Sequence, residues 1–192
     1  SGVMAKSSMR LTTAKAAATD TPIVLTSACI AIFPITPEQN IAHAMTALMA
    51  QNKGAGKNDR MREGFRCGMI LELVYGAAVM LICLGFARPL MSLFVKDEEV
   101  IGHGVVYLHL IAVMYILPAI TNALQGFFRG IGDLKVTLMS SFTNMAVRVI
   151  AAAPMVLLWN FGIEALPYSY LAGWIAMLLV ETPLMLRIYR KK

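Results

Sequence analysis

Residues 68–87 read GMILELVYGAAVMLICLGFA, a run of twenty residues in which only Glu72 is charged. A helix rises about 1.5 Å per residue, so a run of this length can cross the roughly 30 Å hydrocarbon core of a bilayer. Three further apolar runs of similar length follow, at residues 105–128, 136–159 and 165–186. This pattern predicts an all-α fold, a polytopic bundle of transmembrane helices.

The composition supports a membrane protein. Of the 192 residues, 58% are hydrophobic and 15% are charged, with a mean hydropathy of +0.66, whereas soluble domains carry about a quarter charged residues. The net charge of +6 does not indicate a nucleic-acid partner, because Lys and Arg occur in short clusters between apolar runs. Cys29, Cys67 and Cys83 form no CxxC pair or Cys/His cluster, so we expect no disulfide framework and no metal site.

Residues 22–50 form a fifth predicted element with an interruption. Two short apolar stretches flank a polar segment that contains Pro34 and Pro37. Because proline lacks a backbone donor and bends a helix, we predict one broken helix, with a re-entrant hairpin as the alternative. Residues 1–21 are too polar to span a membrane, and their structure is left open. The predicted division is therefore a polar segment, 1–21, and a helical lobe of about five spans, 22–192.

Lys and Arg also predict the orientation, because cytoplasmic loops carry an excess of them. Residues 53–66, 129–135 and 187–192 contain eleven and fall on one side of the membrane, whereas Arg88 and Lys96 fall on the other. We therefore expect a cytoplasmic C-terminus, in the plasma (inner) membrane. The basic residues of the polar N-terminal segment would then lie outside, and we interpret this conflict as the sign of a further helix upstream.

Two glycine-containing segments lie at the predicted cytoplasmic turns. Gln51-Asn52-Lys53-Gly54-Ala55-Gly56-Lys57-Asn58-Asp59-Arg60 is not a phosphate-binding P-loop, which needs glycine at position 51 and Ser or Thr at position 58. We expect its glycines to end a helix through a left-handed residue, with the lysines near the negative helix end and anionic lipid. The segment Phe127-Phe128-Arg129-Gly130-Ile131-Gly132-Asp133 should do the same at the next cytoplasmic turn.

These two segments, with Arg148 in the following helix, resemble the carboxy-terminal lobe of the multidrug and toxic compound extrusion (MATE) transporters. The resemblance covers residues 30–190, and its motif residues are Gln51, Asn52, Gly54, Ala55, Gly56, Lys57, Arg60, Arg129, Gly130, Gly132, Asp133, Arg148 and Val149. Family members have two lobes of six helices with a substrate cavity between them. The resemblance therefore implies one lobe, whose partner is a missing N-terminal lobe or a second copy.

The function that this resemblance implies is transport rather than enzymatic chemistry. It implies a secondary active antiporter in the lipid bilayer that couples entry of H⁺ or Na⁺ to export of small organic, often cationic, compounds. Apart from the coupling ion no cofactor is expected. Two alternatives remain: a lipid-linked oligosaccharide flippase, for which more cationic cavity residues than Arg148 are expected, or a non-transporting fragment or accessory membrane subunit.

Helical spacing groups the polar residues, which are costly in lipid and should face the bundle interior or a wet cavity. The three stripes are Tyr115, Pro118, Asn122 and Gln125; Thr137, Ser141, Asn144 and Arg148; and Tyr170, Trp174, Met177 and Glu181. We expect Tyr115, Asn122, Gln125, Asn144 and Arg148 to line a substrate or ion cavity, with Pro118 opening the backbone. The alternative for the amides is hydrogen bonding between helices.

Three carboxyl groups are candidates for coupling, because a carboxyl group in a low dielectric can exchange a proton near neutral pH. Glu38 directly follows Pro37 in the interrupted segment, and broken helices of transporters often place ion or substrate groups at such interruptions. Glu72 and Glu181 are expected near the cytoplasmic interface. Their alternative role is structural, through contact with lipid headgroups or pairing with Arg148.

Overall fold

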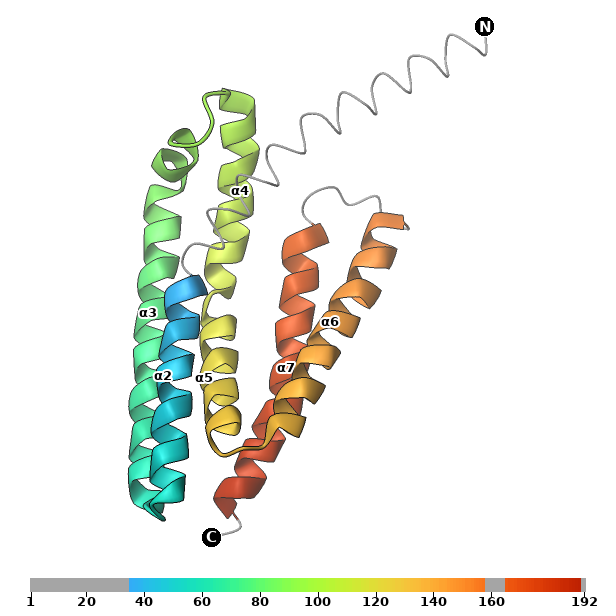
Figure 1. Ribbon diagram of the computed structural model, residues 1–192. Helices are drawn as coiled ribbons and strands as arrows, with labels where there is room; N and C mark the ends of the chain where they lie inside the picture. Colours follow the sequence, from blue (N-terminus) through green and yellow to red (C-terminus); the bar gives the residue numbers. More distant parts are fainter. Residues whose placement is uncertain (1–34, 158–164, 191–192) are drawn as a thin grey trace, which may run out of the picture.

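The computed structural model describes residues 35–157 and 165–190, which fold into six helices (Figure 1). They are α2 (Ile35–Gly54), α3 (Asn58–Ser92), α4 (Glu98–Met114), α5 (Ile116–Gly130), α6 (Leu134–Leu157) and α7 (Ala165–Arg190). The described ranges contain no strand. The predicted all-α class is therefore confirmed.

Three of these helices, α3, α6 and α7, are long and apolar enough to cross a membrane. Helices α4 and α5 meet the same criteria as a pair bent by 43°, which gives up to four spans in the described part of the chain. The fifth predicted element is described only from Ile35 onward, and there α2 runs without interruption through Pro37. The rest of that element and the polar segment 1–21 lie outside the described residues.

Proline positions account for both bends. The run 105–128, predicted as one helix, is divided at Tyr115, three residues before Pro118. Pro118 has no amide proton to donate to the carbonyl of Met114, so the helix changes direction there. Helix α3 bends in the same way at Phe86 (φ −120°, ψ 20°), three residues before Pro89.

Helix α3 extends beyond the apolar run at both ends. The sequence predicted a span over 68–87, but the helix begins at Asn58 and ends at Ser92. Hydropathy marks where lipid contact ends, whereas backbone hydrogen bonding can continue into water. Most of the predicted basic loop 53–66 is therefore helix.

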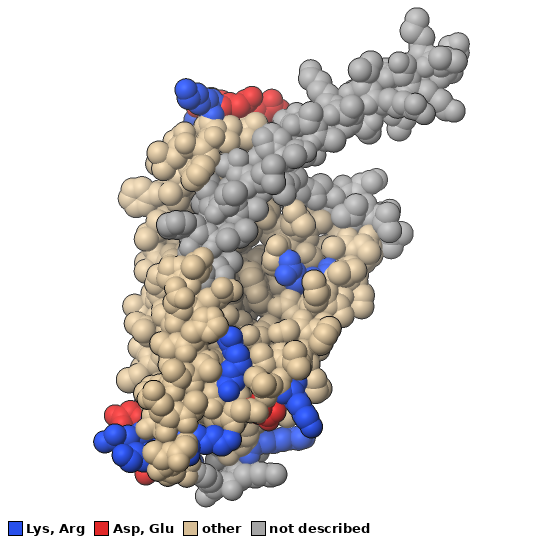
Figure 2. All heavy atoms as spheres, in the orientation of Figure 1, with Lys and Arg blue, Asp and Glu red and all other residues tan. Residues whose placement is uncertain are grey.

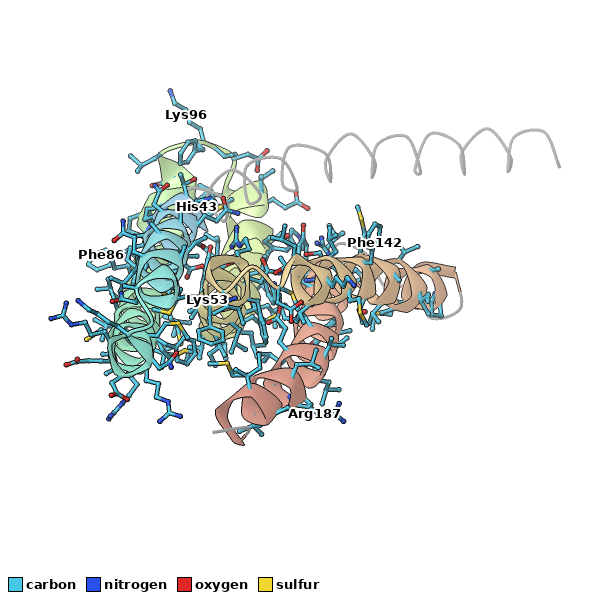
Figure 3. All side chains as sticks on the ribbon, turned by 60° about the horizontal axis from the view of Figure 1, so that its bottom comes forward. His43, Lys53, Phe86, Lys96, Phe142 and Arg187 are labelled. Atoms are coloured by element: carbon cyan, nitrogen blue, oxygen red, sulfur yellow. The ribbon has the colours of Figure 1, made fainter. Side chains whose placement is uncertain are left out.

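Helix α5 is the centre of the bundle. It packs against α2 and α3 on one side and against α6 and α7 on the other. Figure 3 shows this arrangement, with the Lys53 label over α5, Phe142 on α6 and Arg187 on α7. Its Phe127 and Phe128 are 2% and 0% exposed and form a core with residues of α2, α6 and α7. Helix α5 therefore separates the α2–α3 side of the bundle from the α6–α7 side.

Two glycines allow α2 to approach α5 closely. A Cβ atom at Gly126 would lie 2.7 Å from the carbonyl oxygen of Ala42, and one at Gly130 would lie 2.6 Å from that of Thr46. The Thr46 hydroxyl donates to the Gly126 carbonyl at 3.2 Å. This GxxxG spacing is typical of close helix contacts in membranes, and it is a sequence signal that was not used to predict this contact.

The two glycine-containing segments end their helices in the same way. Gly56 and Gly132 have φ of 68° and 78°, and the amide of each donates to the carbonyl three residues earlier. The following amide donates to the carbonyl five residues earlier, which completes a Schellman motif. The predicted helix ends are confirmed, and Lys53 Nζ links the two turns by donating to the Ile131 carbonyl.

Charge is separated between the two ends of the bundle. Figure 2 shows Lys and Arg side chains gathered around the α2–α3 turn, with acidic groups prominent at the opposite end. That opposite end is the α3–α4 turn, where Arg88 pairs with Glu98 at 2.6 Å and the Asp97 side chain caps α4. The α2–α3 turn, the α5–α6 turn and the C-terminal end of α7 share the first end (Figure 1).

Candidate functional site

Glu38 of α2 and Glu72 of α3 lie together in the interior. Both side chains are 0% exposed. They interact electrostatically with each other, and both act on the Tyr75 hydroxyl. Neither oxygen of Glu72 and only one of Glu38 has a hydrogen-bond partner among the described residues. We call Glu38 and Glu72 the carboxyl pair.

Helix α5 closes the carboxyl pair from a third side. Asn122 Nδ2 donates to Glu38 Oε2 over a long 3.4 Å contact. Gly76 makes room here, because a Cβ atom at that position would lie 3.7 Å from Glu38 Oε1 and 3.2 Å from the Ala119 Cβ. Asn122 was predicted from the sequence, whereas Tyr75 and Gly76 were not, although both follow Glu72 by about one helical turn.

Glu72 lies about one helical turn into the apolar run that begins at Gly68, which is the reason for expecting it near the cytoplasmic interface. Helix α3 begins before that run, at Asn58, so its first turns carry the basic residues. The side chain of Glu72 is 0% exposed. Its position near the cytoplasmic interface stays a prediction.

Glu181 occupies the other side of α5. It is 0% exposed on α7 and lies beside Ser140 of α6 and Gln125 of α5, with the Arg129 guanidinium within electrostatic range. These contacts are looser than standard hydrogen bonds, since neither oxygen of Glu181 has a partner of standard geometry in the described ranges. We call Glu181, Gln125, Ser140 and Arg129 the Glu181 cluster.

The predicted cavity wall on α5 is divided between these two sites. Asn122 faces Glu38, whereas Gln125 Nε2 contacts Ser141 Oγ at 3.4 Å and Met177 Sδ at 4.0 Å. Three residues along a helix correspond to a rotation of about 60° around its axis, which is enough to change the neighbouring helix. Tyr115 is 2% exposed, packs in the apolar core at the α4–α5 bend and lies within electrostatic range of Glu38.

Helices α6 and α7 pair in a regular antiparallel register. Arg148 packs on Gly173, Asn144 Nδ2 lies 3.3 Å from Met177 Sδ, and Ser140 lies beside Glu181, so successive contacts step by four residues along each helix. Arg148 is eight residues from Ser140, about 12 Å along α6.

This register gives Arg148 an aromatic partner in place of a carboxylate. Its guanidinium carbon lies 3.6 Å from the centroid of the Tyr170 ring. The ion pair recorded within the described ranges joins Arg88 and Glu98, and the expected pairing of Arg148 with Glu72 or Glu181 is not observed.

The remaining motif residues shape the turns. Gln51, Gly54, Gly56 and Arg60 are exposed at the α2–α3 turn, and Asn52 Nδ2 donates to the Leu48 carbonyl at 2.9 Å. At the second turn, Arg129 Nε donates to the Gln125 carbonyl at 3.2 Å, Gly130 packs on α2 and Gly132 is the left-handed residue. These residues position the helices that carry the buried carboxyl groups.

Known proteins are similar to this chain in sequence and in architecture. The "Probable multidrug resistance protein NorM" of Thermotoga maritima is 26% identical over 143 residues, which are 74% of this chain and 29% of that protein. A solved structure titled as an inward-facing multidrug resistance MATE family transporter of the MOP superfamily matches with a TM-score of 0.75 at 16% identity, over 84% of this chain and 38% of the other.

A second solved structure, the MATE transporter ClbM in complex with Rb⁺, matches with a TM-score of 0.73 at 17% identity, over 90% of this chain and 44% of the other. At these identities the two structures establish the fold. This chain spans less than half the length of each of the three proteins. The sequence profile of the MatE family matches residues 23–154, more than half of the chain, so this chain belongs to the MatE family.

Proposed function

We propose that this chain forms the carboxy-terminal lobe of a secondary active transporter. In this proposal the transporter exports small organic, often cationic, compounds in exchange for H⁺ or Na⁺. The observation that carries the proposal is the carboxyl pair, two fully buried acids within electrostatic range of each other, with no ion pair to Lys or Arg in the described part of the chain. Membership of the MatE family supports the transport role.

The carboxyl pair requires a compensating positive charge. Two ionised carboxylates buried together repel each other and lose their hydration, so the pair is stable only after it gains positive charge. One proton or one monovalent cation supplies that charge. Support for a monovalent cation comes from ClbM, which shares the fold and was solved with Rb⁺.

Coupling follows from the position of the pair between three helices. A cation bound to Glu38 and Glu72 favours the closed packing of α2, α3 and α5, whereas loss of the cation favours a rearranged packing. A cationic substrate that prefers the rearranged state is then linked to ion release, because each ligand shifts the same equilibrium. Asn122 connects this equilibrium to α5 through its contact with Glu38.

We further propose that the end of the bundle with the α2–α3 turn faces the cytoplasm. The support is the concentration of Lys and Arg there (Figure 2). Gly54→Cys and Glu99→Cys lie in exposed positions at opposite ends. In intact cells a membrane-impermeant maleimide should label Glu99→Cys and spare Gly54→Cys, and the opposite pattern would reverse the orientation.

Transport itself can be tested with the full-length protein that contains this chain. We expect proteoliposomes with an imposed pH or Na⁺ gradient to move ethidium, a small aromatic cation, faster than liposomes without protein. Equal ethidium movement in both preparations under either gradient would contradict the proposed function.

A further inference from the structure

The Glu181 cluster is separated from the carboxyl pair by α5, and the coupling scheme above does not use it. The view in Figure 3 shows α5 between the α2–α3 side and the α6–α7 side. Glu181 is 0% exposed, and neither of its oxygens has a hydrogen-bond partner of standard geometry in the ranges that the structure describes. An acid in this position requires its own explanation.

The neighbours of Glu181 fit a proton better than a metal cation. Its polar neighbours are one hydroxyl, Ser140, and one amide, Gln125. Sites for hard metal cations use about six or more oxygen ligands, and the Arg129 guanidinium would repel a metal cation. A buried carboxylate without hydrogen bonds is unstable, whereas the neutral acid can remain in this site.

Arg129 is the charged group that faces Glu181. Residues 121–129 of α5, 136–144 of α6 and 177–185 of α7 contain no other titratable side chain. Helix α7 also packs on α4, but there the contacts involve Leu166, Tyr170 and Leu171 in the first turns of α7, far from Glu181. Burial, the Ser140 hydroxyl, the Gln125 amide and the Arg129 guanidinium therefore act together on the charge state of Glu181, and Arg129 is the charged group among them.

We propose that Glu181 is a proton-binding site, separate from the carboxyl pair, whose carboxylate moves to Arg129 when the proton leaves. With the proton bound, the neutral carboxyl group keeps the observed position between Ser140 and Gln125. In the structure the Arg129 Nε–H donates to the Gln125 backbone carbonyl. After the proton passes to water, the anion pairs with the Arg129 guanidinium. Proton release therefore fixes α7 against the turn between α5 and α6, and proton binding loosens this contact.

The test is infrared difference spectroscopy of the full-length protein, between acidic and alkaline buffer, in the absence of substrate and gradient. The readout is the C=O stretching band of a protonated carboxyl group. We expect Glu181→Gln to remove one titrating band and Glu181→Asp to keep it at a shifted frequency. The Glu38→Gln/Glu72→Gln double variant should retain that band. A Glu181→Gln spectrum identical to that of the wild type would overturn the proposal.

Arg129 variants test the same site while leaving Glu181 in place. We expect Arg129→Gln to shift the loss of the Glu181 band to higher pH by about one unit or more, because an opposite charge is removed. Arg129→Lys should restore most of that shift. An unchanged titration in Arg129→Gln would overturn the role of Arg129. Because these experiments measure no transport, their outcome is independent of the proposed export function.

Discussion

The two sides of α5 place the same residue type in different electrostatic settings. On the α2–α3 side, Glu38 and Glu72 lie within electrostatic range of each other, the Asn122 amide contacts Glu38, and no Lys or Arg forms an ion pair with either acid among the described residues. On the α6–α7 side, Glu181 is a single acid with Arg129 within electrostatic range. All three acids are equally buried. The number and sign of the nearby charges, more than burial, therefore distinguish the two sides.

The two sides also differ in how their helices touch. On the α2 side, Gly126 and Gly130 bring α5 against the backbone of α2. On the other side, Gly173 of α7 accepts the side chains of Arg148 and Asn144. Backbone contacts cannot adjust, while a flexible side chain can, so we expect α2 and α5 to move as one unit and α6 and α7 to adapt.

The largest expected effect is on the free energy of unfolding, when alanine replaces glycine on each side of α5. Gly130→Ala should lower the free energy of unfolding by about 1–3 kcal/mol, because the new methyl group meets the Thr46 carbonyl and Met49. Gly173→Ala should have a smaller effect, since the stem of Arg148 can shift. Gly102→Ala, at an open and exposed position, is the control. Thermal unfolding of the purified protein measures all three, and equal losses at positions 130 and 173 would contradict the comparison.

The second prediction concerns Asn122 and transport driven by a pH gradient. Its amide donates to Glu38 and so stabilises the ionised carboxylate. Asn122→Leu removes this donor and should shift half-maximal transport to higher pH by about one unit, which corresponds to about 1.4 kcal/mol. Thr121→Val is the control, because the Thr121 hydroxyl bonds to the Pro118 carbonyl of its own helix. An unshifted profile in Asn122→Leu would show that α5 does not act on the carboxyl pair.

The third prediction tests the contact between Arg148 and Tyr170. Replacing the ring in Tyr170→Leu should lower stability by about 0.5–2 kcal/mol, the range for cation–π contacts. Tyr170→Phe keeps the aromatic face and should stay close to the wild type. If thermal unfolding shows that Phe is as harmful as Leu, the hydroxyl group and not the ring stabilises this contact between α6 and α7.

The smallest effect is expected outside both sites. Arg88 and Glu98 form a short ion pair, but their side chains are 70% and 75% exposed. Such pairs contribute about 0–1 kcal/mol, and less at high salt. Arg88→Ala should therefore leave the melting temperature nearly unchanged in physiological salt. A loss comparable to that of Gly130→Ala would show that the α3–α4 turn, rather than α5, controls stability.

The sequence predicted the fold better than it predicted the site. Apolar runs located the helices because lipid imposes both length and composition on them, and the glycines at 56 and 132 marked two helix ends. Hydropathy could not reveal that α3 begins at Asn58, because helical hydrogen bonds continue beyond the lipid. The break at Tyr115 was indicated by Pro118, which has no amide proton for the Met114 carbonyl, and not by hydropathy.

The individual site residues were visible, but their grouping was not. Glu38, Glu72 and Glu181 stood out because a charge within an apolar run is costly. Their pairing depends on the rotation of α2 and α3 about their axes, and the partner of Arg148 depends on the register of α6 and α7. These quantities arise from side-chain packing between helices, which periodicity within one helix does not contain.

The central claim is that the carboxyl pair couples ion movement to export. The most direct test measures gradient-driven ethidium transport by the full-length protein in proteoliposomes, comparing Glu38→Gln with Glu63→Gln, an exposed acid on α3. We predict that Glu38→Gln loses at least about tenfold of the gradient-driven rate, equivalent to about 1.4 kcal/mol, while Glu63→Gln matches the wild type. Full gradient-driven transport by Glu38→Gln would contradict the account.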